Sequence, residues 1–452
     1  MPRDRRRDTP GTVMEAARRA RHAAAELASF SADARHRALL AVARAIEEHA
    51  AQILAANARD LDAAGELVAA GTMSDALFRR LRLDESKLRD LLAGIEQVAA
   101  LPDPVGRITL ATELDDGLRL ERVTCPIGVI GVVFESRPDV LPQIASLCLK
   151  SGNAVLLKGG SEAEHSNRIL ARVIQEAESS AGVPDGALTL LETREDVAAL
   201  LGADRDVDLL IPRGSTALVR HMQENTRIPV LGHAEGVCHV YVDRAADLEK
   251  ALAIVLDAKV QYPAACNAVE ALLVHEDVAA EFLPVVIAAL RRRSVEVRCD
   301  GRALGLAGTA DVRAATQADW GTEFGDLVLA VRVVESLDAA IRHVNTHGSR
   351  HTDAIVTEDP EAAERFVAQV DAAGVFVNVS TRFADGYRYG FGAEVGISTG
   401  KLHPRGPVGI DGLVTYKYRL IGDGHVVATY VGPEAKGFRH RELPLEDVVT
   451  SN

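Results

Sequence analysis

One cysteine lies in a stretch whose neighbours leave a thiol open to a substrate. Cys266 follows two alanines and precedes Asn267, in a loop at residues 261–270 that leads into an apolar run. A thiolate acts as a nucleophile only where a substrate reaches it, and the neighbouring amide can donate a hydrogen bond there. Free cysteines are more often small buried apolar residues, so Cys266 alone leaves a catalytic and a structural role open.

Two turns have the composition expected of phosphate-binding sites. The first follows a predicted strand and consists of Lys158, Gly159, Gly160, Ser161 and Glu162. The second follows a neighbouring predicted strand and consists of Pro212, Arg213, Gly214 and Ser215. Backbone N–H groups at the start of a helix bind anions, and two such turns favour a dinucleotide crevice. An ordinary capped turn with a surface lysine remains open for the first.

Two further strand ends carry hydroxyl groups and arginines. The residues concerned are Ser136 and Arg137 after one predicted strand, and Asn378, Ser380, Thr381 and Arg382 after another. An arginine with hydroxyl groups is suited to holding a carboxylate or a phosphate. For Ser136 or Thr381 taken alone, a capping turn is the simpler interpretation.

Several other classes of site are not supported. No Gly-x-Gly-x-x-Gly motif follows a predicted strand, and the segment from Gly396 to Lys401 is one residue short of a Walker loop, which argues against a kinase or an ATPase. The five cysteines are widely spaced, without a Cys-x-x-Cys pair or a zinc-type spacing, so no metal site is predicted.

Composition indicates a folded, acidic enzyme. The chain has 452 residues, 47% of them hydrophobic, and a formal net charge of -14. That charge argues against a nucleic-acid or anionic-membrane surface. The odd number of cysteines fits a reducing compartment, and neither a signal peptide nor an apolar stretch of membrane-spanning length is present. We therefore expect a cytoplasmic protein.

The hydrophobic pattern predicts an α/β fold with two α/β domains. Helical spacing covers much of residues 13–100, a hairpin is predicted around Gly117, and short apolar runs then alternate with helix-length segments. We assign residues 1–105 and 126–260 to a cofactor domain and residues 261–412 to a catalytic domain. Residues 106–125 and 413–452 form the hairpin and a C-terminal tail, which suggest self-association, although a hairpin lying on its own domain stays open.

Several stretches together carry a resemblance to a known family. They include Gly131-Val-Val-Phe-Glu-Ser-Arg-Pro138, Leu157-Lys-Gly-Gly-Ser-Glu-Ala163, Leu210-Ile-Pro-Arg-Gly-Ser215, Ala265-Cys-Asn267 and residues 378–398 followed by 401–407. In this order they resemble the gamma-glutamyl phosphate reductases, which are part of the aldehyde dehydrogenase superfamily. The resemblance spans roughly residues 10–430 and implies the aldehyde dehydrogenase-like fold.

The resemblance implies an activity and a set of roles. Family members use NADPH to reduce L-glutamyl 5-phosphate to glutamate 5-semialdehyde and phosphate in proline biosynthesis, through a thioacyl enzyme. Cys266 matches the nucleophile, with Asn267 and backbone N–H groups as the oxyanion hole. Residues 158–162 would face the adenosine ribose and its phosphate, residues 212–215 the pyrophosphate, and Glu323 the nicotinamide ribose. Arg137, Ser380, Thr381 and Arg382 would hold the glutamyl or phosphate groups, and a complex with glutamate 5-kinase and a homo-oligomer are expected.

Three positions qualify this assignment. Hydrolytic aldehyde dehydrogenases carry a glutamate base where this chain has Gly232, so phosphate rather than water should be the acyl partner, although Glu235 is close by in sequence. Asp139 stands where the family usually has asparagine, which places a negative charge beside the predicted anion site. An acyl-phosphate or acyl-CoA reductase acting on another acid, and a scaffold for the kinase, remain as alternatives.

Overall fold

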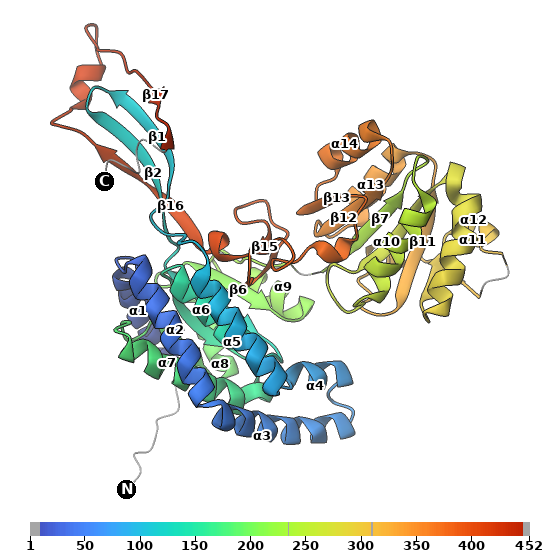
Figure 1. The fold of residues 1–452 in the computed structure, drawn as a ribbon, viewed down its shortest axis with the longest axis horizontal. Helices are drawn as coiled ribbons and strands as arrows, with labels where there is room; N and C mark the ends of the chain where they lie inside the picture. Colours follow the sequence, from blue (N-terminus) through green and yellow to red (C-terminus); the bar gives the residue numbers. More distant parts are fainter. Residues whose placement is uncertain (1–9, 234, 309–310, 446–452) are drawn as a thin grey trace.

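The structure is a computed structural model that describes residues 10–233, 235–308 and 311–445. It contains two α/β domains and an antiparallel sheet that projects away from the first of them (Figure 1). Residues 1–9 of the predicted cofactor domain and residues 446–452 of the predicted tail lie outside the described residues. Within the described residues, no helix is long and apolar enough to cross a membrane.

The first domain is built on a parallel sheet with the strand order β5-β4-β3-β6. Its strands are β3 (Val129–Phe134), β4 (Ala154–Lys158), β5 (Leu188–Leu191) and β6 (Leu209–Arg213). Every residue of β3 and β4 is buried, as is typical of parallel strands covered on both faces. The apolar runs that predicted these strands therefore reflect burial on two sides.

Helices before and between the strands complete this domain. They are α1 (Pro10–Leu27), α2 (Ala32–Glu48), α3 (Ala50–Ala69), α4 (Asp75–Leu81), α5 (Glu85–Ala100), α6 (Val140–Lys150), the 3₁₀ helix η1 (Ser161–Ala163), α7 (Glu164–Ser180), α8 (Arg194–Leu201) and α9 (Thr216–Glu224). Side chains of Ser31, Asp84 and Ser215 accept hydrogen bonds from backbone N–H groups in the first turns of α2, α5 and α9. Such N-caps fix where each helix begins.

The second domain contains a larger parallel sheet with the order β10-β9-β11-β8-β7-β12-β13. Its strands are β7 (Cys238–Val242), β8 (Val269–His275), β9 (Glu296–Cys299), β10 (Arg313–Ala314), β11 (Val328–Val334), β12 (Thr352–Val356) and β13 (Gly374–Val377). Its helices are α10 (Leu248–Val260), α11 (Glu276–Arg292), α12 (Gly301–Leu306), η2 (Ala318–Gly321), α13 (Leu337–His347), α14 (Pro360–Gln369) and η3 (Thr381–Phe383).

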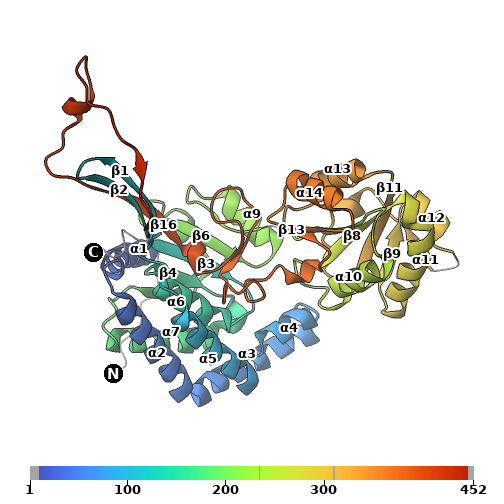
Figure 2. The same ribbon diagram turned by 45° about the horizontal axis from the view of Figure 1, so that its top comes forward.

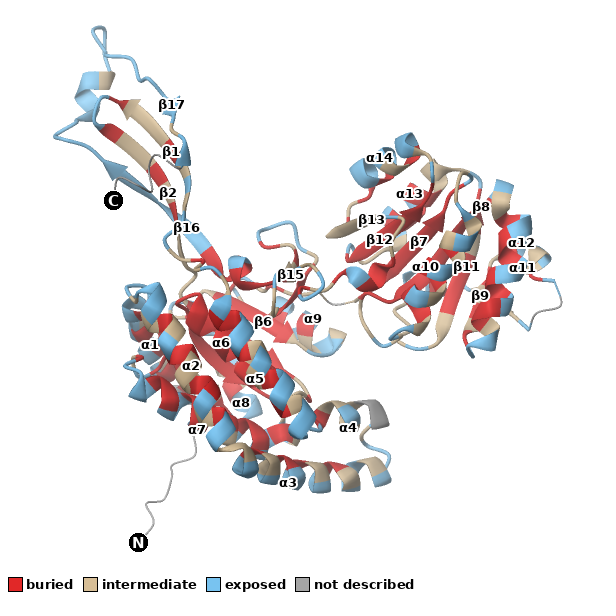
Figure 3. Cartoon of the chain, viewed as in Figure 1, coloured by how far each residue is buried: buried red, intermediate tan, exposed pale blue. Residues whose placement is uncertain are grey.

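The projecting sheet joins the predicted hairpin to the C-terminal part of the chain. Its order is β16-β2-β1-β17, with β1 (Ile108–Asp115), β2 (Leu118–Pro126), β16 (Val414–Ile421) and β17 (Arg441–Glu442). The 3₁₀ helix η5 (Val427–Tyr430) connects β16 to β17. In Figure 3 this sheet and its connections carry far less buried surface than the two domains. Of the two alternatives that the sequence left open for the hairpin, the structure shows the projecting arrangement rather than a hairpin lying on its own domain.

Two predicted domain boundaries are wrong. The boundary at residue 260 assigned β7 and α10 to the first domain, but β7 pairs with β8 and β12 in the second sheet. Conversely, β14 (Gly396–Ser398), β15 (Gly406–Val408) and η4 (Ile410–Leu413) follow the second domain in sequence, yet Val408 and Leu413 belong to the hydrophobic core of the first. Strand composition does not reveal which sheet a strand joins, because all these strands are apolar. In Figure 1, β15 lies between the domains, and Figure 2 shows the same two domains from a second direction.

Candidate active site

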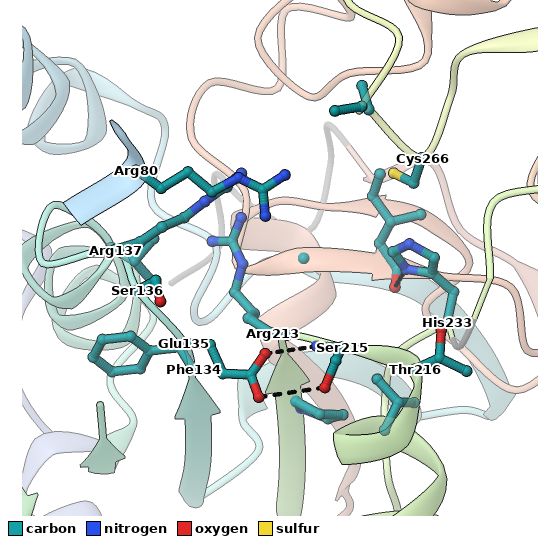
Figure 4. Close-up of a pocket in the computed structure, with 18 of the residues that line it drawn as sticks. Arg80, Phe134, Glu135, Ser136, Arg137, Arg213, Ser215, Thr216, His233 and Cys266 are labelled. Atoms are coloured by element: carbon teal, nitrogen blue, oxygen red, sulfur yellow. Dashed lines mark hydrogen bonds between the residues drawn. The ribbon is translucent and has the colours of Figure 1, made fainter. Parts of the chain in front are cut away.

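A cavity of about 820 Å³ lies between the two domains. The first domain contributes residues that follow β3 and β6, including Ser136 and Ser215, and the second contributes Cys266, Glu323 and Arg382. Figure 4 shows Arg80, Arg137 and Ser136 on one side and Cys266 with His233 on the other. We call these two sides the first-domain wall and the second-domain wall.

The Cys266 loop is bracketed by a buried ion pair. Lys259, near the end of α10, lies 2.7 Å from Glu270 on β8, and both side chains are at most 1% exposed. Within the loop, the backbone N–H groups of Ala265 and Ala268 donate to the carbonyl oxygens three residues earlier. The ion pair ties together the two ends of the loop, so the cysteine is presented by a short segment with fixed ends.

A histidine contacts the thiol of Cys266. The distance from His351 Nε2 to Cys266 Sγ is 3.2 Å, and His351 Nδ1 lies 2.9 Å from the hydroxyl oxygen of Thr352. His351 immediately precedes β12, and Cys266 precedes β8, so both lie at the amino-terminal edge of the second sheet. The hydroxyl contact holds the imidazole with its other nitrogen facing the sulfur.

Burial favours the neutral forms of both groups. The pKa of Cys266 is raised to about 12, first by burial and then by the charges of Glu323 and Glu394, while Arg382 acts in the opposite direction. The pKa of His351 is lowered to about 3 by burial and, to a lesser extent, by His233. A neutral thiol therefore faces a neutral imidazole, and a bound electrophile would be needed to draw the proton from sulfur to nitrogen.

Carboxylates organise the first-domain wall. Glu135 accepts hydrogen bonds from Ser215 through its backbone N–H at 2.8 Å and its hydroxyl at 3.3 Å. Glu162 accepts at 2.6 Å from both the N–H and the hydroxyl of Ser136. A Cβ atom on Gly214 would lie 2.4 Å from a Glu135 oxygen, so a larger residue here would displace the Glu135 side chain from its present position. The N-terminus of α9 opens into the cavity here, which fits the phosphates of a nucleotide.

Four arginines line the same cavity: Arg80, Arg137, Arg213 and Arg382. Arg80, Arg137 and Arg213 extend toward a common space in Figure 4. Arg213 donates from Nη1 to the backbone oxygen of Glu394 at 3.3 Å, and Arg382 donates from Nε to the side chain of Gln261 at 2.9 Å. Their remaining N–H groups suit a phosphate or carboxylate. The same cavity is also lined by the carboxylates of Glu135, Glu162, Glu323, Asp385 and Glu394.

Known proteins share this sequence and fold. The aldehyde dehydrogenase family model matches residues 5–303. A gamma-glutamyl phosphate reductase from Natronomonas pharaonis is 58% identical over 94% of this chain and 97% of its own, and one from a Cyanothece species is 55% identical over 96% and 99%. The chain belongs to the gamma-glutamyl phosphate reductase family. A crystal structure of the family member from Thermotoga maritima has a TM-score of 0.88, with 40% identity over 92% of this chain and 99% of that one.

The family resemblance and the aldehyde dehydrogenase-like fold expected from sequence are thereby confirmed. Most residues predicted for the site also converge in the cavity. They are Ser136, Arg137, Glu162, Pro212, Arg213, Gly214, Ser215, Cys266, Asn267, Glu323 and Arg382. Asn267 donates from its side-chain nitrogen to the backbone oxygen of Ala384 at 2.8 Å, which fixes the amide beside Cys266.

Other predicted residues lie outside the cavity lining: Lys158, Gly159, Gly160, Ser161, Asn378, Ser380 and Thr381. Asn378 does not contact the cavity, because it follows β13 at the carboxyl edge of the second sheet, opposite Cys266. There its side chain pairs with the backbone N–H and carbonyl of Thr357 at 2.9 and 2.8 Å. Ser380 caps the turn before Arg382, and Thr381 is fully buried. Lys158 is 7% exposed, and burial lowers its pKa.

The sequence comparison predicted Gly232 at the place where hydrolytic aldehyde dehydrogenases carry a glutamate base, and the structure shows where its neighbour Glu235 lies. Glu235 forms an ion pair with Arg220 at 2.5 Å outside the cavity lining. Cys238 and His239, interpreted as structural residues, are fully buried; the Cys238 thiol donates to the backbone oxygen of Cys266 at 3.3 Å. The position of Glu235, outside the cavity lining, therefore does not support a role as the general base.

Sequence reasoning missed several residues of the site. They are His351, His233, Arg80, Glu394 and Gly236. A Cβ atom on Gly236 would lie 2.1 Å from the carbonyl oxygen of Cys266. Arg80 belongs to a helix before the first strand, and His351 precedes a strand rather than following one. A search for polar residues that follow predicted strands therefore misses both Arg80 and His351.

Proposed function

We propose that this protein catalyses the NADPH-dependent reduction of L-glutamyl 5-phosphate to L-glutamate 5-semialdehyde and phosphate, the second step of proline biosynthesis from glutamate. The observation that carries the proposal is the contact between Cys266 and His351 in a cavity lined by four arginines. The relatives named above carry the same activity in their names.

The first chemical step transfers the acyl group to sulfur. His351 accepts the Cys266 proton as the sulfur attacks the acyl carbon; the bond from that carbon to the phosphate oxygen breaks, and phosphate leaves. The Asn267 side chain and nearby backbone N–H groups stabilise the oxyanion. The resulting thioester accepts a hydride more readily than a carboxylate does. NADPH, when bound, would supply that hydride; the carbon–sulfur bond would then break to give the aldehyde, and the Cys266 sulfur would take its proton back from His351.

The remaining cavity residues bind the two ligands. Arg137, Arg213, Arg80 and Arg382 suit the phosphate and carboxylate of the substrate. The N-terminus of α9 with Pro212–Ser215 suits the cofactor pyrophosphate, and Glu323 the nicotinamide ribose. Of the first turn, from Lys158 to Glu162, only Glu162 lines the cavity; by resemblance to the family this turn would face the adenosine ribose. The proposal of NADPH rather than NADH rests on that resemblance.

The reverse reaction tests the proposal. Pyrroline-5-carboxylate, in equilibrium with the semialdehyde, is supplied with NADP⁺, and NADPH absorbance is followed with phosphate, with coenzyme A, or with neither. Phosphate-dependent turnover that is lost in Cys266→Ala and reduced in His351→Gln is expected. Turnover with coenzyme A would instead indicate an acyl-CoA reductase, turnover with neither would indicate hydrolysis, and none would favour another acid or a scaffold role. The same assay with NAD⁺ decides the cofactor.

Assembly and location extend the proposal. Strand β16 exposes Tyr416, Tyr418, Leu420 and Ile421, which supports a homo-oligomer formed through the projecting sheet. The described cysteines are all free, in keeping with a reducing cytoplasm. Light scattering of the wild type and of Tyr418→Asp would test the first point, with a smaller particle expected for the variant. Co-purification with glutamate 5-kinase would test the proposed partner.

A further inference from the structure

A cysteine and two histidines form a cluster in the second-domain wall with the composition of a transition-metal site. The ligand atoms that Cys266, His233 and His351 can offer all lie within 4.8 Å of one another. The closest pair, Cys266 Sγ and His351 Nε2, is separated by 3.2 Å. Zinc binds sulfur at about 2.3 Å and imidazole nitrogen at about 2.0–2.1 Å, so tetrahedral ligands lie roughly 3.3–3.6 Å apart. Small side-chain rotations would bring the three atoms to that spacing.

Each imidazole is oriented by its second nitrogen. His233 Nδ1 lies 3.2 Å from the carbonyl oxygen of Ile397, and because a carbonyl only accepts, Nδ1 carries the proton and Nε2 keeps its lone pair. His351 Nδ1 lies 2.9 Å from the Thr352 hydroxyl, which leaves its Nε2 toward the sulfur. Metal-binding histidines characteristically use their other nitrogen in this way.

The cluster leaves one coordination position toward the cavity. His233 and Cys266 both line the cavity, whereas His351 is 1% exposed and lies behind them. The two rings meet edge to face, with centroids 5.2 Å apart. Three protein ligands with an open fourth position are typical of an accessible zinc site, and sulfur with two imidazoles selects thiophilic cations over Mg²⁺ or Ca²⁺.

We propose that Cys266, His233 and His351 bind Zn²⁺, or a similar thiophilic divalent cation, reversibly. The Cys266 thiol loses its proton to solvent as the sulfur–metal bond forms, and water or an anion takes the fourth position. No electrons are transferred. The bound metal is coordinated by both the Cys266 sulfur and the His351 nitrogen, so neither is available for catalysis. The metal-bound form therefore cannot form a thioester. This inhibitory consequence rests on the proposed function; the binding itself does not.

Binding is measured without substrate or nucleotide. Co²⁺ is added to the full-length protein, and the near-ultraviolet charge-transfer absorption of a cobalt–thiolate bond is recorded; Zn²⁺ affinity is measured by competition with a chromophoric chelator. We expect the band to vanish in Cys266→Ala, and Zn²⁺ affinity to fall by at least tenfold in His233→Ala and in His351→Ala, because even the loss of a second-shell partner weakens metal binding by about 10–100-fold. Cys125→Ala and His22→Gln, at a partly exposed thiol and an exposed histidine, serve as controls and should match the wild type.

A second measurement needs no variant. One equivalent of Zn²⁺ should slow alkylation of Cys266 by iodoacetamide, read by mass spectrometry, and a chelator should restore it. No protection, or histidine variants with unchanged Zn²⁺ affinity, would overturn the site. Missing turnover in metal-free protein would instead count against the proposed reaction, so the two failures are distinguishable.

Discussion

The two walls of the cavity are built at opposite ends of their sheets. The first-domain wall uses the carboxyl ends of β3 and β6, where Ser136 and Ser215 follow the strands. The second-domain wall uses amino-terminal edges: Gly236 precedes β7, Cys266 precedes β8, and His351 precedes β12. Carboxyl ends lead into helix N-termini, which bind anions. The amino edge instead brings three separate chain segments together around one sulfur.

The walls also differ in how they are held. On the first-domain wall, Glu135 and Glu162 hold their turns through hydrogen bonds to the exposed Ser215 and to the buried Ser136. The second-domain wall depends on buried contacts, including the Lys259–Glu270 pair and the close approach of Gly236 to Cys266. Changes to the second wall should therefore alter stability and turnover, whereas changes to the first should alter ligand binding.

The largest effect is expected at the buried ion pair. Lys259→Met leaves Glu270 as an unpaired buried carboxylate, which should lower the free energy of unfolding by about 3–5 kcal/mol, measured by urea denaturation. The double variant Lys259→Met/Glu270→Gln should recover part of that loss. Lys250→Met removes an exposed partner of Glu358, and the free energy of unfolding of this variant should remain close to that of the wild type. Equal effects of the two lysine variants would contradict the view that the second wall depends on burial.

Gly236→Ala should mainly affect turnover. The added methyl group would meet backbone atoms of Cys266, which cannot move without displacing the Cys266 side chain; because Cys266 is the proposed nucleophile, kcat should fall by roughly 100-fold. NADP⁺ binding, measured by fluorescence titration, should change little. Gly305→Ala on α12, where a Cβ atom meets no neighbour within 4 Å, is the control in the same domain. A Gly236→Ala enzyme with wild-type kcat would show that the close approach does not position Cys266.

Arg80→Leu should mainly affect substrate binding. Its guanidinium lines the cavity, and the loss of a hydrogen bond to a charged group should raise the KM for phosphate in the reverse reaction by roughly 10- to 100-fold. Arg79→Leu changes the neighbouring residue of α4, which does not line this cavity, and should have a smaller effect. If both variants behave alike, the effect is one of overall charge rather than of position.

The smallest effect concerns pH and the second domain. Burial, followed by the charges of His239, His347 and Arg332, lowers the pKa of His343 to about 2. A lowered pKa gives a contribution to stability that is present above the unfolded value of about 6.5 and is lost as the pH falls toward the folded value, by about 1.0 kcal/mol between about pH 6.5 and about pH 5.5. Thermal unfolding at these two pH values should show a smaller loss of stability for His343→Gln than for the wild type. His22→Gln in the first domain should reproduce the wild-type loss.

The periodicity of the sequence was sufficient for the strands of the first sheet and for much of the second. Val129–Phe134 and Ala154–Lys158 are apolar runs because both faces of each strand are covered. The first-domain wall was also predictable, since polar turns after strands have a local signature. Asn378 is also a polar residue directly after a strand, but it lies at the carboxyl edge of the second sheet, away from Cys266. A polar turn after a strand does not by itself show which edge of that sheet holds the site.

By itself the sequence identified Cys266 as the candidate nucleophile and determined the glycine turns, the α/β class and, through its motifs, the family. Only the tertiary structure decided that β7 joins the second sheet, that residues 396–413 return to the first domain, and that His233 and His351 meet Cys266. The physical reason is that strand formation and capping depend on neighbours in sequence. Sheet order and the contacts of the sulfur depend on segments that folding brings together.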